Sequence, residues 1–191
     1  MRIGGGSTHG RRLRTVTGLQ VRPTSGLVRQ ALFNMLREHT PGGIFVDLFA
    51  GTGSVGLEAL SHGARAVYFV EHDRRALAVL QANIRHCAVA AQVTLVAAAL
   101  PQALQQLPAT LQADVLFLDP PYASDMGEAV LEALTHRNLL APHGVLVWQH
   151  ATRRRVPPVV LERPLWKSRR YSNTQLSLYM VLAECPPALE P

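Results

Sequence analysis

Residues 115 to 122 read V-L-F-L-D-P-P-Y and predict both a strand and a site at its end. The four apolar residues are typical of a buried strand. Pro120 and Pro121 lack the N–H that a sheet ladder needs and hold φ near about −65°, so the chain leaves the sheet in one stiff direction. Asp119 precedes a proline and is biased toward extended geometry. A carboxylate and the Tyr122 ring should therefore meet at the carboxyl end of a strand, where open α/β sheets bind ligands. The alternative is a plain strand-terminating turn with an exposed tyrosine.

Length and composition favour a single soluble domain. The chain has 191 residues, enough for one α/β core, and no stretch approaches roughly 20 uninterrupted apolar residues. The N-terminal M-R-I-G-G-G lacks the apolar segment of a signal peptide. Cys87 and Cys185 lie far apart without a CxxC pattern, and the eight histidines show no metal-ligand spacing. We therefore expect a cytoplasmic protein with no membrane span, no bound metal and no disulfide framework.

Strand-like and helix-like segments alternate along most of the chain. Strands are expected at 44–49, 66–70, 93–96, 114–118 and 145–148, and helices at 55–60, 74–86, 100–107 and 128–134, with an earlier helix capped by Thr24 or Ser25. Repeated β-α-β units with buried, non-alternating strands form parallel sheets with right-handed crossovers. The pattern predicts an α/β fold with a doubly wound, mostly parallel sheet.

The two ends of the chain differ from this middle part. Residues 1–22 are rich in Gly, Ser, Thr and Arg and predict a basic N-terminal arm or loose hairpin. Residues 167–171 and 175–182 alternate like strands and predict an antiparallel hairpin at the sheet edge. A single domain is expected to cover 23–183, followed by a frayed tail at 184–191.

The net charge of +6 is unevenly distributed. Residues 1–37 carry seven arginines and no acidic residue, and residues 151–191 carry seven basic and three acidic residues. Residues 38–150 carry five basic and ten acidic residues. This pattern favours contact of both ends with nucleic-acid phosphates while the middle holds a small ligand. The alternative is that the arginine-rich ends are simply solvated.

A glycine-rich segment from Asp47 to Gly56, D-L-F-A-G-T-G-S-V-G, follows the first expected strand. Its glycines allow a tight turn and close approach of a ligand, and the next helix offers free N–H groups. Glu71 lies 20 residues beyond Gly51 at the end of the second strand, where a carboxylate can accept hydrogen bonds from ribose hydroxyls. This combination would suit NAD as well as another nucleoside, and the loop could also serve only to pack a helix on a strand.

Two features favour a nucleoside without a pyrophosphate. Asp47 stands four residues before Gly51, where its carboxylate would repel a pyrophosphate but could bind an ammonium group. The Asp-Pro-Pro-Tyr turn has no role in hydride transfer. S-adenosylmethionine carries an adenosine and an ammonium group and no phosphate, so we expect it to be the cofactor.

In order, a D-x-F-x-G-x-G loop, an acidic end of the second strand and a D-P-P-Y turn resemble the S-adenosylmethionine-dependent amino-methyltransferases. The bacterial 16S ribosomal RNA guanine-N2 methyltransferases, methyltransferase D type, are similar also at residues 2–6, 10–13, 22–24, 32–34, 56–61 and 169–171. The resemblance runs from Arg2 to about Met180. It implies a Rossmann-like class I methyltransferase fold and an rRNA (guanine-N2)-methyltransferase activity. It also implies a monomer acting on 16S ribosomal RNA or the assembled small ribosomal subunit.

The resemblance also implies which residues hold the cofactor. They surround the glycine loop and the ends of the second and third strands: Thr24, Asp47, Phe49, Ala50, Gly51, Gly53, Glu71, His72, Ala98 and Leu100. Ala98 lies where such enzymes usually carry an acidic residue that binds the adenine amino group. Backbone groups and packing against Leu100 would then recognise adenine. A second departure is Gln149, which stands where the family often has Glu.

The Asp-Pro-Pro-Tyr turn is expected to bind the methyl acceptor. Guanine N2 is a poor nucleophile because its lone pair is delocalised into the ring. Hydrogen bonds to the Asp119 carboxylate and the Pro120 carbonyl would hold this amine in line with the methyl group, and Tyr122 would stack on the base. The base must be unpaired or flipped to reach the site.

Arginines of both basic ends would neutralise RNA phosphates without reading sequence. They are Arg2, Arg11, Arg12, Arg14, Arg22, Arg153, Arg154 and Arg155. Arg29 and Arg37 could equally be ordinary solvated positions on a helix.

Other functions use the same turn. By family resemblance it also serves DNA adenine-N6, DNA cytosine-N4 and protein glutamine-N5 methylation. A DNA enzyme would be expected to carry a larger target-recognition region, and a protein-glutamine enzyme more typically has Asn before the prolines. A catalytically silent RNA-binding module is the remaining alternative, and the departure at Ala97-Ala98-Ala99 favours it.

Overall fold

A computed structural model of the chain describes residues 1–16, 25–122 and 124–181. The predicted site residues Arg22 and Thr24 and the predicted tail at 184–191 lie outside the described residues. The helices are α1 (Gly26–Met35), α2 (Ser54–Ser61), α3 (Arg74–Cys87), α4 (Met126–Thr135) and the 3-10 helices η1 (Ala90–Gln92) and η2 (Gln102–Gln106). The strands are β1 (Ile44–Asp47), β2 (Ala66–Glu71), β3 (Val93–Ala97), β4 (Ala113–Leu118), β5 (Leu140–Ala151), β6 (Val159–Val160), β7 (Arg163–Tyr171) and β8 (Thr174–Tyr179).

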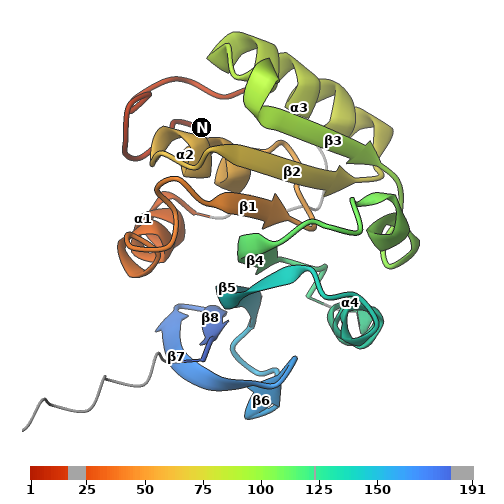
Figure 1. Cartoon of the computed structure of the whole chain (residues 1–191). Coiled ribbons are helices and arrows are strands. Elements are labelled where there is room, and N and C mark those ends of the chain that lie inside the picture. The colour runs from red at the N-terminus through yellow and green to blue at the C-terminus, as the bar shows by residue number, and fades with distance from the viewer. Residues whose placement is uncertain (17–24, 123, 182–191) are drawn as a thin grey trace, which may run out of the picture.

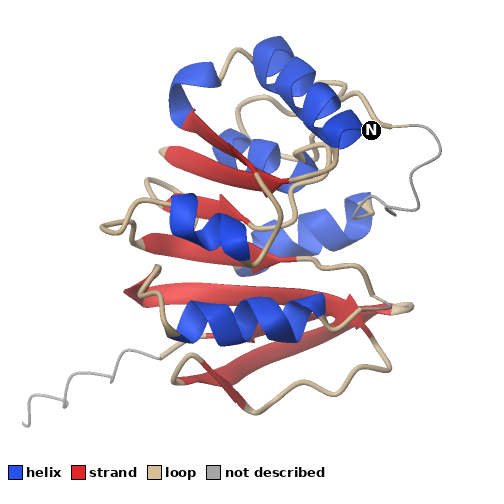
Figure 2. Ribbon diagram, turned by 90° about the vertical axis from the view of Figure 1, so that its right-hand side faces the viewer, coloured by secondary structure: helices blue, strands red, loops and turns tan. Residues whose placement is uncertain are grey.

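These strands form one sheet in the order β3-β2-β1-β4-β5-β8-β7-β6 (Figure 1). Strands β1 to β5 pair in parallel, and β8 inserts antiparallel between β5 and β7. Helices lie on both faces of the sheet (Figure 2). The prediction of a doubly wound, mostly parallel sheet with a C-terminal antiparallel hairpin is confirmed.

The strands are apolar on both faces because both faces are covered. Phe45 and Phe117 point into a core formed with α1, α2 and α3. Trp148 and Tyr179 belong to a second core, formed with η2 and α4 on the opposite face. Each of these side chains is at most 1% exposed, and burying one contributes on the order of 1.5–3 kcal/mol. This double covering explains why the strands read as continuous apolar runs.

Some elements differ from the prediction in extent, in type or in being unpredicted. Strand β5 begins at Leu140 instead of 145, because Leu140 pairs with Ala113 ahead of a register shift in β4. The helix expected at 100–107 is a 3-10 helix, η2. Strand β6 was not predicted, since two residues are too few to show a period.

Within the described residues 1–16 the N-terminal segment forms a hairpin, as one form of the prediction had it, but the hairpin is not loose. Arg2 pairs antiparallel with Arg12, and Ile3 and Leu13 are only 1% and 3% exposed in the core beneath α1 and α2. Gly6 has φ of +76°, and a Cβ there would lie 1.9 Å from the backbone oxygen of Ser61. Only glycine permits this close approach of the hairpin to the end of α2.

Arg29 is neither solvated nor available to RNA. Its Nε lies 2.6 Å from Glu58 Oε2, and the two side chains are 3% and 1% exposed. Its Nη2 donates to the carbonyl of Arg2 at 2.7 Å. One buried guanidinium thus joins α1, α2 and the N-terminal hairpin.

No helix within the described ranges is long and apolar enough to cross a bilayer. Among the same residues, no three His, Cys, Asp or Glu side chains are grouped so that they could hold a metal ion.

Arg29→Ala should strongly destabilise the protein, because it leaves Glu58 charged and buried without its partner. A loss of about 3–5 kcal/mol in the free energy of unfolding is expected from urea denaturation. Arg37→Ala is the control: the Arg37 side chain is 77% exposed beside Glu38, and such surface pairs contribute about 0–1 kcal/mol. Equal, small losses in both variants would contradict the assignment of Arg29 as a residue that stabilises the fold through its buried pair with Glu58.

Candidate active site

The register of the parallel strands brings the predicted site residues to one edge of the sheet. Asp47 on β1 is level with Phe69 on β2 and Phe117 on β4. Glu71 and Asp119 each lie two residues further along their own chains. Neighbouring strands are about 4.8 Å apart, and β1 lies between β2 and β4, so these two carboxylates flank the loop that follows β1.

The glycine loop turns tightly from β1 into α2. Gly51 and Gly53 have φ of +54° and +80°, in the left-handed region. A Cβ on Gly53 would also lie 2.3 Å from Leu80 Cδ1 of α3. Position 53 therefore favours glycine for two reasons: its φ is one that other residues rarely adopt, and there is no space for a side chain. The turn leaves the first backbone N–H groups of α2 near the carboxyl edge of the sheet.

The Asp47 carboxylate fixes the far end of this loop, at the start of α2, by a hydrogen bond. Its side chain is buried, and its Oδ2 accepts a hydrogen bond from the backbone N–H of Gly56 at 3.1 Å. Oδ1 is buried and has no hydrogen-bond partner among the described residues. Burial raises the pKa of Asp47 to about 7, with a further contribution from the charge of Glu71. Such a carboxylate would gain from a nearby cation, and its contact with an ammonium group stays a prediction.

Glu71 joins the glycine loop to the end of β2. Its Oε2 accepts from the N–H of Gly51 at 2.7 Å, and its Oε1 accepts from the N–H groups of His72 and Asp73 at 2.7 and 2.8 Å. The carboxylate is therefore held in place before any ligand binds. Its predicted contact with ribose hydroxyls is compatible with the 10% exposure of its side chain.

The other predicted cofactor residues lie at the same edge. Ala97 of β3 pairs with Glu71, so Ala98 follows directly at the edge of the sheet. Ala98 is half-buried, and Leu100 is 8% exposed in the core beside η2. Phe49 is half-buried and packs against the same core. Backbone groups, a fixed carboxylate and apolar side chains thus meet here, and this set of groups fits a nucleoside.

The Asp-Pro-Pro-Tyr turn is held by side chains of β5 and β8. Gln149 Nε2 donates to Asp119 Oδ2 at 2.9 Å and to the hydroxyl of Tyr122 at 3.2 Å. The Tyr122 hydroxyl also lies 3.0 Å from Thr174 Oγ1. Sequence reasoning did not predict roles for Gln149 and Thr174, because only the strand pairing shows that they face the turn.

Some of the predicted RNA-binding arginines are bonded within the protein. Arg11 donates to the carbonyl of His86, and Arg154 is paired with Glu128 and donates to the carbonyl of Ser124. Arg154 is therefore partly neutralised. The side chains that remain exposed are those of Arg2, Arg12, Arg14, Arg153 and Arg155. Arg169 and Arg170 on β7 are exposed too, and they were not predicted as RNA contacts.

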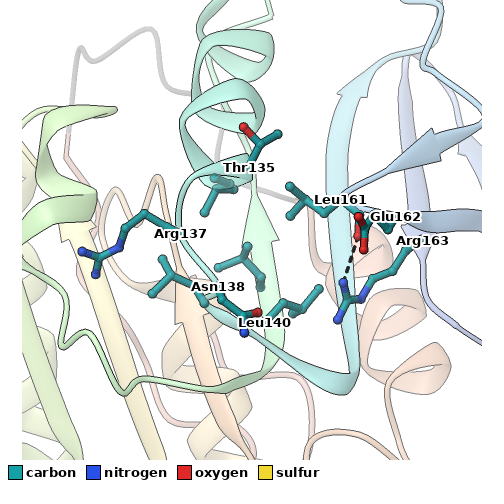
Figure 3. Close-up of a pocket in the computed structure, with 10 residues that line it drawn as sticks. Thr135, Arg137, Asn138, Leu140, Leu161, Glu162 and Arg163 are labelled. Carbon is teal, nitrogen blue, oxygen red and sulfur yellow. Dashed lines mark hydrogen bonds between the residues drawn. The ribbon is translucent and has the colours of Figure 1, made fainter.

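A depression of about 490 Å³ lies elsewhere on the protein (Figure 3). Thr135 and Arg137 at the end of α4 line it, together with Leu161 and Arg163. Leu140 also lines it and begins β5, whereas Gln149 lies close to the other end of that strand. The depression thus lies away from the carboxyl edge, and none of the residues that line it is a predicted site residue.

Asp47→Asn should change how stability depends on pH. The folded protein binds a proton on Asp47 more tightly than the unfolded chain does, because the pKa is raised from 3.8 to about 7. Its contribution to stability is present below about pH 4 and is lost as the pH rises through about 7. Asparagine cannot titrate. The difference in the free energy of unfolding between native protein and variant, measured by urea denaturation, should therefore be more unfavourable to the variant at pH 4.5 than at pH 8. An equal difference at both values would contradict the raised pKa.

Comparison with known proteins identifies relatives along nearly the whole chain. Residues 1–180 match the protein family described as Conserved hypothetical protein 95. The YlbH protein of Bacillus subtilis is 30% identical over 94% of this chain and 98% of its own length. "Ribosomal RNA small subunit methyltransferase D" of Haemophilus influenzae is 32% identical over 76% of both chains.

A solved structure shares the fold as well. It is a hypothetical protein of Thermus thermophilus, 33% identical, with a TM-score of 0.81, and the match covers 95% of this chain and 99% of that one. The expected Rossmann-like class I methyltransferase fold is confirmed by such neighbours. Since the family match covers nearly the whole chain, the protein belongs to the Conserved hypothetical protein 95 family, the family of the methyltransferase D proteins.

Proposed function

We propose that this protein transfers a methyl group from S-adenosylmethionine to the exocyclic N2 amine of a guanine in 16S ribosomal RNA. Methylation of ribosomal RNA is the activity for which its relatives are named. The observation that carries the finer proposal is the position of the Asp119 carboxylate. It lies at the same sheet edge as the glycine loop and Glu71, two strands away across β1.

The methyl donor would be held by the first half of the site. The glycine loop allows close approach to its backbone, Glu71 offers a carboxylate that the Gly51 N–H holds in place for ribose hydroxyls, and Ala98 and Leu100 offer an apolar surface for adenine. The Asp47 carboxylate would attract the positively charged ammonium group of the donor. When bound, S-adenosylmethionine supplies an electrophilic methyl group on a positively charged sulfur.

The acceptor amine would be held by the second half. Asp119 and the Pro120 carbonyl would accept hydrogen bonds from the two N–H groups of guanine N2 and orient its lone pair. Orientation of this kind can contribute roughly 7–11 kcal/mol at best. The hydrogen bonds of the Tyr122 hydroxyl to Gln149 and Thr174 fix its ring, which would stack on the base with about 1–3 kcal/mol.

Asp119 acts in this proposal as an orienting acceptor. The amine nitrogen would bond to the methyl carbon as the carbon–sulfur bond breaks, and the electron pair of that bond would stay on sulfur. The methylated amine is then positively charged and highly acidic, so it can lose its proton to water. No metal and no covalent intermediate with the protein is required.

RNA phosphates would be bound beside the acceptor site. The loop after β5 carries Arg153 and Arg155, and the backbone N–H of Thr152 in that loop donates to the carbonyl of Asn173 at 3.1 Å. This bond places the loop next to the β7–β8 turn, which leads directly into Thr174. The exposed arginines of β7 extend the same basic region. We propose a cytoplasmic, monomeric enzyme whose substrate is 16S ribosomal RNA or the assembled small subunit.

Asp119→Ala should abolish most of the activity while cofactor binding persists. The measurement is tritiated methyl transfer to RNA and small subunits from a strain that lacks this protein, followed by nucleoside analysis. The native protein should yield N2-methylguanosine, and the variant should yield little. Loss of an electrostatic partner of this kind lowers kcat on the order of 100- to 1,000-fold. Cofactor affinity from calorimetry should change little.

The same experiment decides between the alternatives. N6-methyladenine in DNA, methylated glutamine in protein, or full activity in Asp119→Ala would overturn the proposal. Absence of binding at millimolar S-adenosylmethionine would favour a silent RNA-binding module.

The double variant Arg153→Gln, Arg155→Gln should bind RNA more weakly and with less salt dependence. Each lost phosphate contact lowers the slope of log K against log salt by about 0.7–0.9, so a change of roughly 1.5 is expected from filter binding at several salt concentrations. Arg65→Gln is the matched control, since Arg65 is exposed before the start of β2, at the opposite edge. A change half as large in the control, which removes one positive charge instead of two, would mean that only net charge matters.

A further inference from the structure

We infer that Gln149 is a positioning residue that sets the Asp119 carboxylate and the Tyr122 ring in one arrangement through its amide N–H groups. This inference rests on the proposed function and deepens it, because it names the group that prepares the acceptor site. Gln149 itself would touch neither the base nor the methyl donor.

Gln149 is held firmly enough for this role. It follows Trp148, which pairs with Leu118 at the end of β4, and it pairs with Leu176 of β8 on its other side. The residue is 3% exposed, and Trp148 beside it is fully buried. Because the residue is buried and its amide nitrogen is bonded to Asp119 and Tyr122, the amide group has little freedom to move away from the turn.

The side-chain amide of Gln149 can donate both hydrogen bonds at the same time. Its nitrogen carries two N–H groups, and the distances of 2.9 Å to Asp119 Oδ2 and 3.2 Å to the Tyr122 hydroxyl allow one N–H for each. A carboxylate can accept at about four sites, so one bond from Gln149 orients it without filling its capacity. The oxygens that remain can accept from guanine N–H groups.

A carboxylic acid at position 149, the residue type that the family often has there, could do this only while the Glu–Asp pair shares a proton. An ionised glutamate there would have no donor, and two carboxylates within hydrogen-bond distance do not both ionise readily. The pair would retain a proton well above the ordinary range of a carboxyl group and would titrate as one unit. With that proton, the acid can still donate to Asp119. Without it, the two groups repel each other and the acceptor is displaced.

The test compares Gln149→Glu with the native protein at several pH values between 5 and 9. The measured quantity is the ratio of kcat for methyl transfer to 16S ribosomal RNA, variant over native, so that any titration common to both proteins cancels. The ratio should be highest at low pH and should fall at least tenfold as the pair loses its proton. A ratio that does not change with pH, whether high or low, contradicts the inference.

A double-mutant cycle tests the same point without a titrating group. Gln149→Leu should lower kcat on the order of 100-fold, as expected when a reacting group is misplaced by about 1 Å, and should leave cofactor affinity unchanged. If Gln149 acts through Tyr122, adding Tyr122→Phe should cost less in the Gln149→Leu background than in the native one. Full additivity of the two effects would contradict the inference.

Ser177→Ala is the matched control. Ser177 is also fully buried in the β5–β8 region, but its hydroxyl is bonded to His150, away from the turn. This variant should lose stability with no change in kcat or in its pH dependence. Failure of the proposed function would differ visibly from failure of this inference, since the native protein would then form no N2-methylguanosine at any pH.

Discussion

The parallel pairing of β1 with β2 and β4 is the constraint on which the rest of the structure depends. Its register sets Asp47, Phe69 and Phe117 level, so that the residues that follow them emerge at one edge. A slip of one residue in β4 would turn Asp119 to the other face of the sheet. The two apolar cores oppose such a slip, because Phe117 is buried in the core on one face and Leu116 in the core on the other.

Buried and half-buried polar side chains then fix the parts of this edge relative to one another. Glu71 binds the N–H of Gly51, Asp47 binds the N–H of Gly56, and Gln149 binds Asp119 and Tyr122. Most of these bonds join segments that are distant in the sequence. The site is therefore arranged before a ligand arrives, and a prearranged site loses less free energy to reorganisation during the reaction.

The sequence predicts the local parts of this site better than their connections. Asp119, the prolines and the glycine loop form patterns that sequence reasoning recognises, because strand ends and tight turns demand particular residues nearby. The contact of Arg29 with Glu58 and that of Gln149 with Asp119 join residues about 30 positions apart, and no local pattern predicts them. The start of β5 was also missed, since Pro142 and Gly144 are typical of a turn yet lie within a paired strand.

The central claim is that one sheet edge holds the methyl donor and the acceptor amine face to face. A crystal structure with S-adenosylmethionine bound tests it most directly. The account predicts the ribose beside Glu71, the adenine near Ala98 and Leu100, and the methyl group directed at the Asp119 carboxylate. A donor bound in the depression between Thr135 and Arg163, or a methyl group directed away from Asp119, would contradict it.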